Sequence, residues 1–267
     1  MGRILSAFIG RDWAYQTASK FAIFGQLSSV LVMCAMMFFI GRTFGSSATA
    51  LRAVHGQYFE FVLIGIVFAR FQSVALNSFS SAIQRDQVSG TIEAILVTRA
   101  SVPAVVLASA ISAFLFTAVQ TVLILFIGAA VFGVNLHHAN VPSSLAALAL
   151  SMLAISPIGI CAAASVIAFK KGTGAVGMVA SATNLLGGVY FPISVLPLPL
   201  KILSVVFPIT HGLSALRQAI LHGAGFGLIR GDLAVLAGFA VVGIPLALAL
   251  FMMSVQHARR VGTLAYI

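Results

Sequence analysis

The sequence predicts an all-α polytopic membrane protein with six transmembrane helices. Three observations support this fold class: 60% of the 267 residues are hydrophobic, only 7% are charged, and the mean hydropathy is +1.10. An ordinary soluble domain has about 25% charged residues, whereas a membrane-spanning helix needs about 20 apolar residues in a row. Runs of that length recur along the chain. They are continuously apolar rather than alternating, which favours helices over a β-barrel.

The N-terminal segment, residues 1–20, is predicted to form a helix that lies at the membrane interface. Apolar and polar side chains fall on different sides of it, and Trp13 and Tyr15 are residue types that settle among lipid headgroups. Positive charges before an apolar run also resemble a signal peptide. The run at residues 21–40 is longer than a typical signal sequence, however, and no small-residue cleavage pattern follows it. We therefore expect residues 21–40 to form the first span.

Five further spans are expected from the remaining apolar runs, and the whole chain, 1–267, is predicted to be one transmembrane domain. These spans cover residues 58–80, 104–131, 143–169, 174–190 and 233–255. No clean span fits between the last two, because prolines interrupt residues 196–222. We expect two short half-buried helices there, packed against protein, since irregular backbone at membrane depth must be covered.

The basic residues predict that both termini lie on the inner side of the membrane. With this topology, 9 of the 15 Lys and Arg residues lie in inner segments and 5 in outer segments, while Arg70 lies within the membrane. Such a bias agrees with the positive-inside rule. The net charge is +10, and the basic residues that produce it are scattered singly at the ends of apolar runs. It therefore indicates membrane orientation and contact with lipid headgroups rather than nucleic-acid binding.

The densest polar segment is residues 84–103, QRDQVSGTIEAILVTRASVP. It holds four of the chain's 20 charged side chains, namely Arg85, Asp86, Glu93 and Arg99. Ile92, Ile95 and Leu96 follow helical spacing and give one apolar edge, and Gly90 can act as an N-cap. The pattern predicts a short amphipathic helix on a membrane face that contacts a partner in water. The alternative is a loop whose charges are only solvated.

Arg70 is predicted near the middle of the second span, and Glu60 near that span's outer end. An arginine at the bilayer centre costs about 3 kcal/mol on insertion scales, so it marks a functional site by default. A structural role, in a watery cavity or paired with another helix, is the alternative, and both interpretations stay open.

No catalytic or metal site is predicted. Residues 172–177 match G-x-G-x-x-G, but they lack the preceding strand and the following acidic residue of a dinucleotide site, and they also fail as a P-loop. His137 and His138 have no carboxylate nearby in the sequence. An intramembrane enzyme would need converging acids and bases, yet the five carboxylates lie on different segments. A channel would be expected to show a filter-like motif, and none is repeated in the sequence.

Three features together resemble the permease subunits of ABC-2 type exporters. They are GTIEAILVTRAS after the second predicted span, GGVYFPISVLPLPLKILSVVFPITHGLSALRQAILHG after the fifth, and six predicted spans in one chain. The resemblance covers nearly the whole sequence. It implies a multi-pass protein of the bacterial cytoplasmic membrane, with both termini cytoplasmic.

The resemblance also implies partners and site residues. Residues 1–20 would form an interface helix, residues 84–103 would carry a coupling helix docked on a cytoplasmic ABC ATPase, and residues 196–222 would form re-entrant outer helices. The expected coupling residues are Arg85, Asp86, Gly90, Thr91, Glu93 and Arg99. The expected outer-gate residues are Pro197, Pro208, His211 and Arg217. ATP and Mg would bind to the ATPase and no cofactor to this chain, and a second copy or a paralogous permease would complete the dimer.

The predicted cargo is a lipid-linked glycan or glycolipid that moves outward. Tyr58 and Phe61 could stack on sugars, and Arg70 could bind a phosphate, so these residues are assigned to the translocation path. The alternative for the aromatic residues is contact with lipid. Two other functions stay open: an ABC-2 exporter of amphiphilic drugs or lipids, and a channel or intramembrane enzyme without an ATPase partner.

Overall fold

The computed structural model describes residues 10, 20–44, 58–88, 102–169 and 173–261. This part of the chain is helical and contains no strand, which confirms the all-α fold class. Its elements in chain order are α2 (Lys20–Phe44), α4 (Tyr58–Val88), α6 (Val102–Phe132), α7 (Val141–Phe169), α8 (Thr173–Leu186), the 3-10 helix η1 (Ile193–Val195), α9 (Leu198–Val206), α10 (Pro208–Leu221) and α11 (Phe226–Val261).

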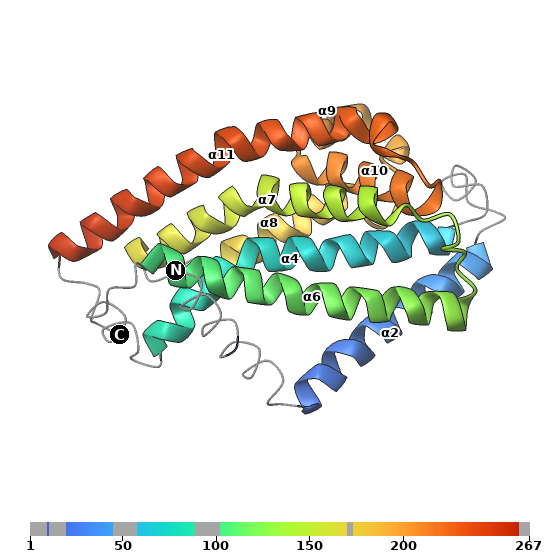
Figure 1. Ribbon diagram of the computed structural model, residues 1–267, viewed down its shortest axis with the longest axis horizontal. Helices are drawn as coiled ribbons and strands as arrows, with labels where there is room; N and C mark the ends of the chain where they lie inside the picture. The colour runs from blue at the N-terminus through green and yellow to red at the C-terminus, as the bar shows by residue number, and fades with distance from the viewer. Residues whose placement is uncertain (1–9, 11–19, 45–57, 89–101, 170–172, 262–267) are drawn as a thin grey trace.

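The long helices form a bundle with α4 and α7 at its centre (Figure 1). α4 packs against α2, α6, α7, α8 and α10, and α11 lies along α7. α2 diverges from the bundle toward its N-terminal end (Figure 1). One end of the bundle, here the α10 end, carries α9, α10 and the starts of α4, α7 and α11. The opposite end, here the Val88 end, carries the last turns of α4, α7 and α11 and the start of α6.

Four helices of the described chain are long and apolar enough to cross a membrane. These segments are Tyr58–Ser81, Ala110–Phe132, Val141–Ser165 and Phe226–Ser254. α9 and α10 together count as a fifth if they form one bent span. Six spans are therefore not confirmed. α2 contributes only the shorter apolar stretch Ser28–Thr43. The 14 residues of α8 extend about 21 Å, less than the roughly 30 Å of a hydrocarbon core.

Several helix bounds differ from the predicted span limits for local reasons. α8 ends at Leu186, before residue 190, because Gly188 adopts a φ of +77°, a left-handed conformation typical of glycine after a helix. α4 continues past residue 80 to Val88, and α11 starts at Phe226 rather than at residue 233. Hydropathy marks where the chain leaves hydrocarbon, whereas backbone hydrogen bonding continues a helix into the polar regions.

The proline-rich region forms two short helices, α9 and α10, whose axes differ by 83°. The break falls at Phe207, which has extended backbone angles and precedes Pro208, the first residue of α10. α9 buries only Ser204, whereas most of α10 is buried in the bundle. Thr210 Oγ donates to the Ser204 carbonyl over 2.5 Å and so ties the two helices together. By length and composition the pair fits a broken span as well as a re-entrant pair, so re-entry stays a prediction.

Small residues let α7 and α10 approach α4 closely. A Cβ added at Gly159 of α7 would lie 2.3 Å from the Ala75 carbonyl oxygen of α4. A Cβ at Gly212 of α10 would lie 2.7 Å from the ring of Phe68, also on α4. Membrane helices use such small residues for close packing. The close packing brings the break between α9 and α10 next to α4 and α8.

Candidate functional site

Arg217 of α10 is the centre of a cluster at the α10 end. Its guanidinium carbon lies 3.3 Å from the centroid of the Phe61 ring on α4. Nε and Nη2 donate to the Phe61 carbonyl over 3.3 and 3.1 Å, and Nη2 also donates to the carbonyls of Gly188 (2.9 Å) and Val189 (3.1 Å). Arginine's planar fork suits both contacts with carbonyl oxygens and stacking on a ring. One side chain therefore joins α10, α4 and the turn after α8.

Gly65 of α4 allows that turn to reach Arg217. A Cβ at this position would lie 2.2 Å from the Val189 carbonyl oxygen and 3.1 Å from Nη2 of Arg217. The turn itself depends on Gly188, whose positive φ costs other residues energy. The sequence thus provides backbone space on α4 and a left-handed residue in the turn. Together they place two carbonyl oxygens within reach of the guanidinium.

Tyr58, at the first turn of α4, closes the same cluster. Its hydroxyl donates to the Tyr190 carbonyl over 3.2 Å and lies 4.0 Å from the sulfur of Met37 on α2. Tyr58 and Phe61, which were assigned to the translocation path, therefore lie together with Arg217, which was assigned to the outer gate. We name this cluster the outer clamp, after the outer gate to which Arg217 was assigned from the sequence. It is formed by Tyr58, Phe61, Gly188, Val189, Tyr190 and Arg217.

His211 links α10 to two other helices beside the outer clamp. Its Nδ1 lies 2.9 Å from Oδ1 of Asp232 on α11, and its Nε2 lies 3.0 Å from the Val205 carbonyl oxygen on α9. Both side chains of the pair are 19% exposed, and they form an ion pair when the imidazole is protonated. The other Asp232 oxygen lies 3.4 Å from Nε2 of Gln218. Two of the four predicted gate residues, His211 and Arg217, thus hold α10 against its neighbours. Pro208 is the buried first residue of α10, and Pro197 lies exposed at the start of α9.

Arg70 lies on a different face of α4 from the outer clamp. Nine residues separate Phe61 from Arg70, which is about two and a half helical turns and places them on opposite faces. Arg70 is half-buried, and its Nη2 donates to Oε1 of Gln120 on α6 over 2.8 Å. The structure therefore does not bring the three predicted path residues together.

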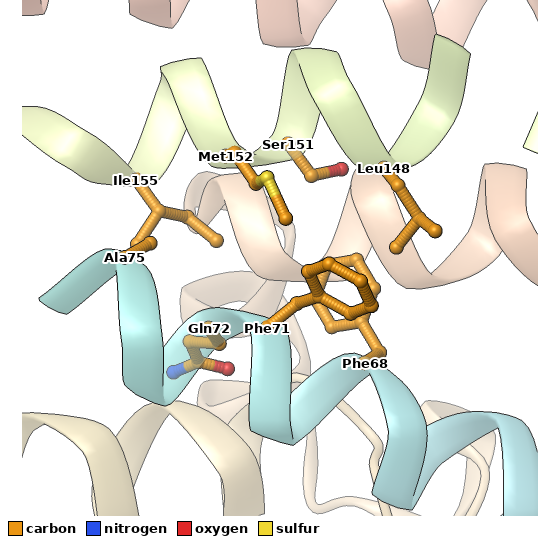
Figure 2. A pocket seen from close by; sticks show the side chains of 8 residues that line it. All are labelled: Phe68, Phe71, Gln72, Ala75, Leu148, Ser151, Met152 and Ile155. Atoms are coloured by element: carbon orange, nitrogen blue, oxygen red, sulfur yellow. The ribbon is translucent and has the colours of Figure 1, made fainter. Parts of the chain in front are cut away.

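A narrow pocket, too small to hold a water molecule, lies between α4 and α7. Figure 2 shows Phe68 and Phe71 of α4 facing Leu148 and Met152 of α7. The remaining lining residues are Gln72, Ala75, Ser151 and Ile155. A second pocket, with room for about one water molecule, extends from Gln72 to the break between α9 and α10. The walls of both pockets are mainly apolar.

Gln72 borders both pockets and carries the buried polar contact between α4 and α8. It is 3% exposed, and its Nε2 donates to Oγ of Thr183 over 2.5 Å. Thr183 Oγ donates in turn to the carbonyls of Val179 and Ala180. Oε1 of Gln72 has no hydrogen-bond partner. The unmet acceptor costs stability, whereas the bond from the buried Nε2 to Thr183 is directional and fixes the position of α8 relative to α4.

The predicted coupling residues belong to the segment 84–103, which starts at the Val88 end of the bundle. Arg85 and Asp86 lie in the last two turns of α4, so that this helix extends into the segment 84–103, where a separate short amphipathic helix was expected. Gly90, Thr91, Glu93 and Arg99 lie outside the described residues. The helix ends that flank them, at Val88 and Val102, lie at the end of the bundle opposite α9 and α10 (Figure 1).

Sequence reasoning missed three residues that position the site: Gly65, Gln72 and Asp232. Gln72 gave a signal, because an amide in the middle of an apolar run needs a partner. Asp232 gave a weaker one, as a carboxylate placed just before the last predicted span. Gly65 gave none, since the turn that it accommodates is more than a hundred residues away in the sequence.

The comparison with protein families adds independent evidence. The family model of the ABC-2 type transporter matches residues 8–221, which include the outer clamp, the helices α2 to α10 and the polar segment 84–103. A search of curated proteins found no significant match. Because the family match covers most of the sequence, the chain belongs to the ABC-2 type transporter family, as the sequence motifs predicted.

Proposed function

We propose that this chain is the permease subunit of an ATP-driven exporter that moves a lipid-linked glycan or glycolipid outward across the bacterial cytoplasmic membrane. Family membership supports a membrane transport subunit that works with an ATPase. One structural observation supports the coupling between them. α4 is a single helix of 31 residues, about 46 Å long, that runs from the outer clamp to the polar segment 84–103.

In this proposal, α4 transmits movement from one side of the membrane to the other. A cytoplasmic ABC ATPase docks on residues 84–103 through Arg85, Asp86, Glu93 and Arg99. Closure of the ATPase pair displaces the segment, and the rigid helix carries that displacement to Tyr58 and Phe61 in the outer clamp. Packed helices respond to such forces as rigid bodies that switch between discrete arrangements. The outward path opens when the clamp releases α10.

ATP and Mg are assigned to the partner subunit. A phosphate-binding loop of the G-x-x-x-x-G-K-[ST] type requires a Gly-Lys pair, and the sequence contains none. The chain would act as a dimer, with itself or with a paralogous permease, above two ATPase subunits. In this arrangement residues 1–20 form the interface helix and α9 and α10 form the re-entrant pair on the outer side.

An exporter of amphiphilic drugs or lipids is the second candidate, and one observation favours it. Tyr58 and Phe61, which were expected to stack on sugars, are engaged with Tyr190 and Arg217 of the same chain. Sugar stacking would therefore require the outer clamp to open first. A smaller amphiphile would not depend on these rings.

Co-purification and transport assays test the proposal. The chain is expressed with its candidate ATPase, reconstituted in proteoliposomes, and assayed for ATP turnover and for ATP-dependent movement of a lipid-linked glycan and of a fluorescent short-chain phospholipid. We expect the wild type to retain the ATPase and to move the glycan. The double variant Glu93→Ala plus Arg99→Ala should lower coupled ATP turnover at least tenfold, and Arg230→Ala, at an exposed site at the α10 end, should not.

Two results would decide against parts of this proposal. Movement of the phospholipid without the glycan would contradict the glycan cargo and support the second candidate, an exporter of amphiphilic drugs or lipids. Failure of the wild type to bind any ATPase would overturn the exporter itself and favour a channel or an intramembrane enzyme.

A further inference from the structure

α4 exposes a short polar strip at membrane depth. Within the candidate span Tyr58–Ser81, Ser73 is the one residue classed as exposed, and Arg70 and Asn77 on the same face are half-buried. These three residues stand at i, i+3 and i+7, which places them along one side of the helix. Nδ2 of Asn77 donates to the carbonyl of Ser73 over 2.8 Å. We name Arg70, Ser73 and Asn77 the α4 polar strip.

The positive charge of this strip has no negative counterpart in the described chain. A guanidinium has five N–H donors, and the described contact of Arg70 is a single hydrogen bond to the neutral amide of Gln120. No carboxylate in the described segments contacts it. α2, α6, α7, α8 and α10, which all pack against α4, contain no Asp or Glu. On α4 itself, Glu60 and Asp86 lie about 15 and 24 Å away along the axis.

Two long helices differ from the strip. In the described part of α6, and in α11 between residues 233 and 253, the exposed large side chains are apolar, as expected for contact with lipid, for example Val122 (68%), Phe126 (67%), Val241 (73%) and Leu246 (62%). An arginine at membrane depth faces protein or a water-filled path instead. Arg217 shows how this chain satisfies an arginine structurally, with three carbonyls and a ring. Arg70 has no such set of partners.

We infer that the α4 polar strip, with Gln120 orienting Arg70, binds the phosphate group of an amphiphile as it crosses the membrane. The inference rests on the proposed transport function and names the chemistry of the cargo. Arginine binds phosphate through paired N–H donors, and a phosphate has further acceptor oxygens for a second donor. Ser73 supplies an exposed hydroxyl about one turn from Arg70. The site offsets the cost of removing an anionic headgroup from water at the depth where that cost is greatest.

Photo-crosslinking locates and measures this binding. The full complex is purified in an uncharged maltoside detergent with a dodecyl phosphate that carries a photoreactive diazirine, and crosslinked residues are identified by mass spectrometry. We expect crosslinks on α4 and α6 near Arg70 and Gln120. Unlabelled dodecyl phosphate should compete at a concentration at least tenfold lower than dodecanol or inorganic phosphate.

Variants assign the recognition to Arg70. Arg70→Gln should lower the crosslink yield about tenfold, and Arg230→Gln should leave it unchanged. Arg70→Lys should give an intermediate yield, because the charge remains but the paired N–H donors are lost. Equal competition by dodecanol would show that the phosphate is not recognised, and equal competition by inorganic phosphate would show that the alkyl chain is not. Either result overturns the inference on wild-type protein alone, whether or not a variant folds.

Crosslinking in the presence of ATP distinguishes a transported amphiphile from a lipid that stays bound. Loss of the crosslinks near Arg70 during ATP turnover supports transport of the bound phosphate compound. Unchanged crosslinks in a complex that hydrolyses ATP would identify a resident lipid and overturn the cargo assignment, while the proposed exporter would stand. Absence of an ATPase partner would instead remove the exporter, and phosphate binding at Arg70 would still be measured independently.

Discussion

Arg217 and Arg70 show two different environments for a charged residue in an apolar bundle. Arg217 is surrounded by backbone carbonyls and the Phe61 ring, whereas Arg70 has one neutral partner, Gln120. Arg70 could be selected from the sequence because an arginine inside an apolar span is costly, and Arg217 through the family resemblance of residues 196–222. Their partners could not. The hydrogen bond from Arg217 to Phe61 spans 156 positions of the sequence, and only the packed bundle brings these residues together.

The contacts of the outer clamp predict that substitutions of Arg217 and Arg230 have very different effects on the free energy of unfolding. Arg217→Met removes a donor from the carbonyls of Phe61, Gly188 and Val189, and we expect the free energy of unfolding to fall by about 3 kcal/mol. Arg230→Met, at an exposed position, should change it little. Thermal unfolding in detergent measures both variants. Equal loss of stability in the two would contradict the clamp.

Two glycines on membrane helices should respond in opposite ways to the same substitution. Gly65→Ala forces a Cβ against the Val189 carbonyl oxygen, and we expect it to destabilise the protein by about 2 kcal/mol. A Cβ at Gly238 of α11 would meet no atom within 4 Å, so Gly238→Ala should be neutral or slightly stabilising. The same unfolding measurement compares them. A tolerated Gly65→Ala would show that the turn does not approach α4 this closely.

At the scale of elements, the composition predicted the all-α class and the prolines predicted the break between α9 and α10. The lengths of the apolar runs predicted span limits that differ from the helix bounds. The break between α9 and α10 follows directly from Pro208, which cannot continue the preceding helix. The predicted fifth span was too long at its C-terminal end, since α8 stops before Gly187 and Gly188. Hydropathy records that residues are apolar, but it does not record whether they remain helical. For the same reason it ended the second predicted span at residue 80, although α4 continues through Arg85 and Asp86 to Val88.

The contact between α4 and α8 can be tested by a double-mutant cycle. Thr183→Val leaves Nε2 of the buried Gln72 without its partner, and we expect a loss of about 2 kcal/mol in unfolding free energy. Adding Gln72→Leu should recover most of that loss, because both polar groups are then absent. Chemical denaturation in mixed micelles gives the coupling energy. Additive losses would indicate that the two side chains do not interact.

A second cycle tests the link between α10 and α11. His211→Ala and Asp232→Ala each break the pair whose nitrogen and oxygen lie 2.9 Å apart. We expect a coupling energy of about 1 kcal/mol, because the pair is largely but not fully buried. His222 is an exposed histidine that follows α10, and the cycle of His222→Ala with Asp232→Ala serves as the control. Coupling as large in the control as in the His211 cycle would contradict a specific pair.

At the scale of the whole molecule, the proposed transport depends on the connection between the two ends of the bundle. The motifs at both ends could be predicted from the sequence, in residues 84–103 and 196–222, and the family match covers them up to residue 221. The sequence did not reveal that one helix, α4, connects these two regions. Tyr58 and Phe61 at the start of α4 were assigned to the translocation path, and their contacts within the outer clamp were not predicted. Their actual neighbours depend on how α10 and the turn after α8 fold back onto α4.

The most direct test of this account is a distance measurement at the α10 end. Spin labels are placed at Lys201 on α9 and Val131 on α6, both exposed, after Cys34 and Cys161 have been replaced by alanine. Double electron–electron resonance is recorded on the complex with its ATPase, without nucleotide and with ATP plus vanadate. We predict that trapping shifts the distance distribution in wild type and not in Glu93→Ala plus Arg99→Ala. An unchanged distribution in a wild-type complex that hydrolyses ATP, or an equal shift in the double variant, would contradict transmission through α4.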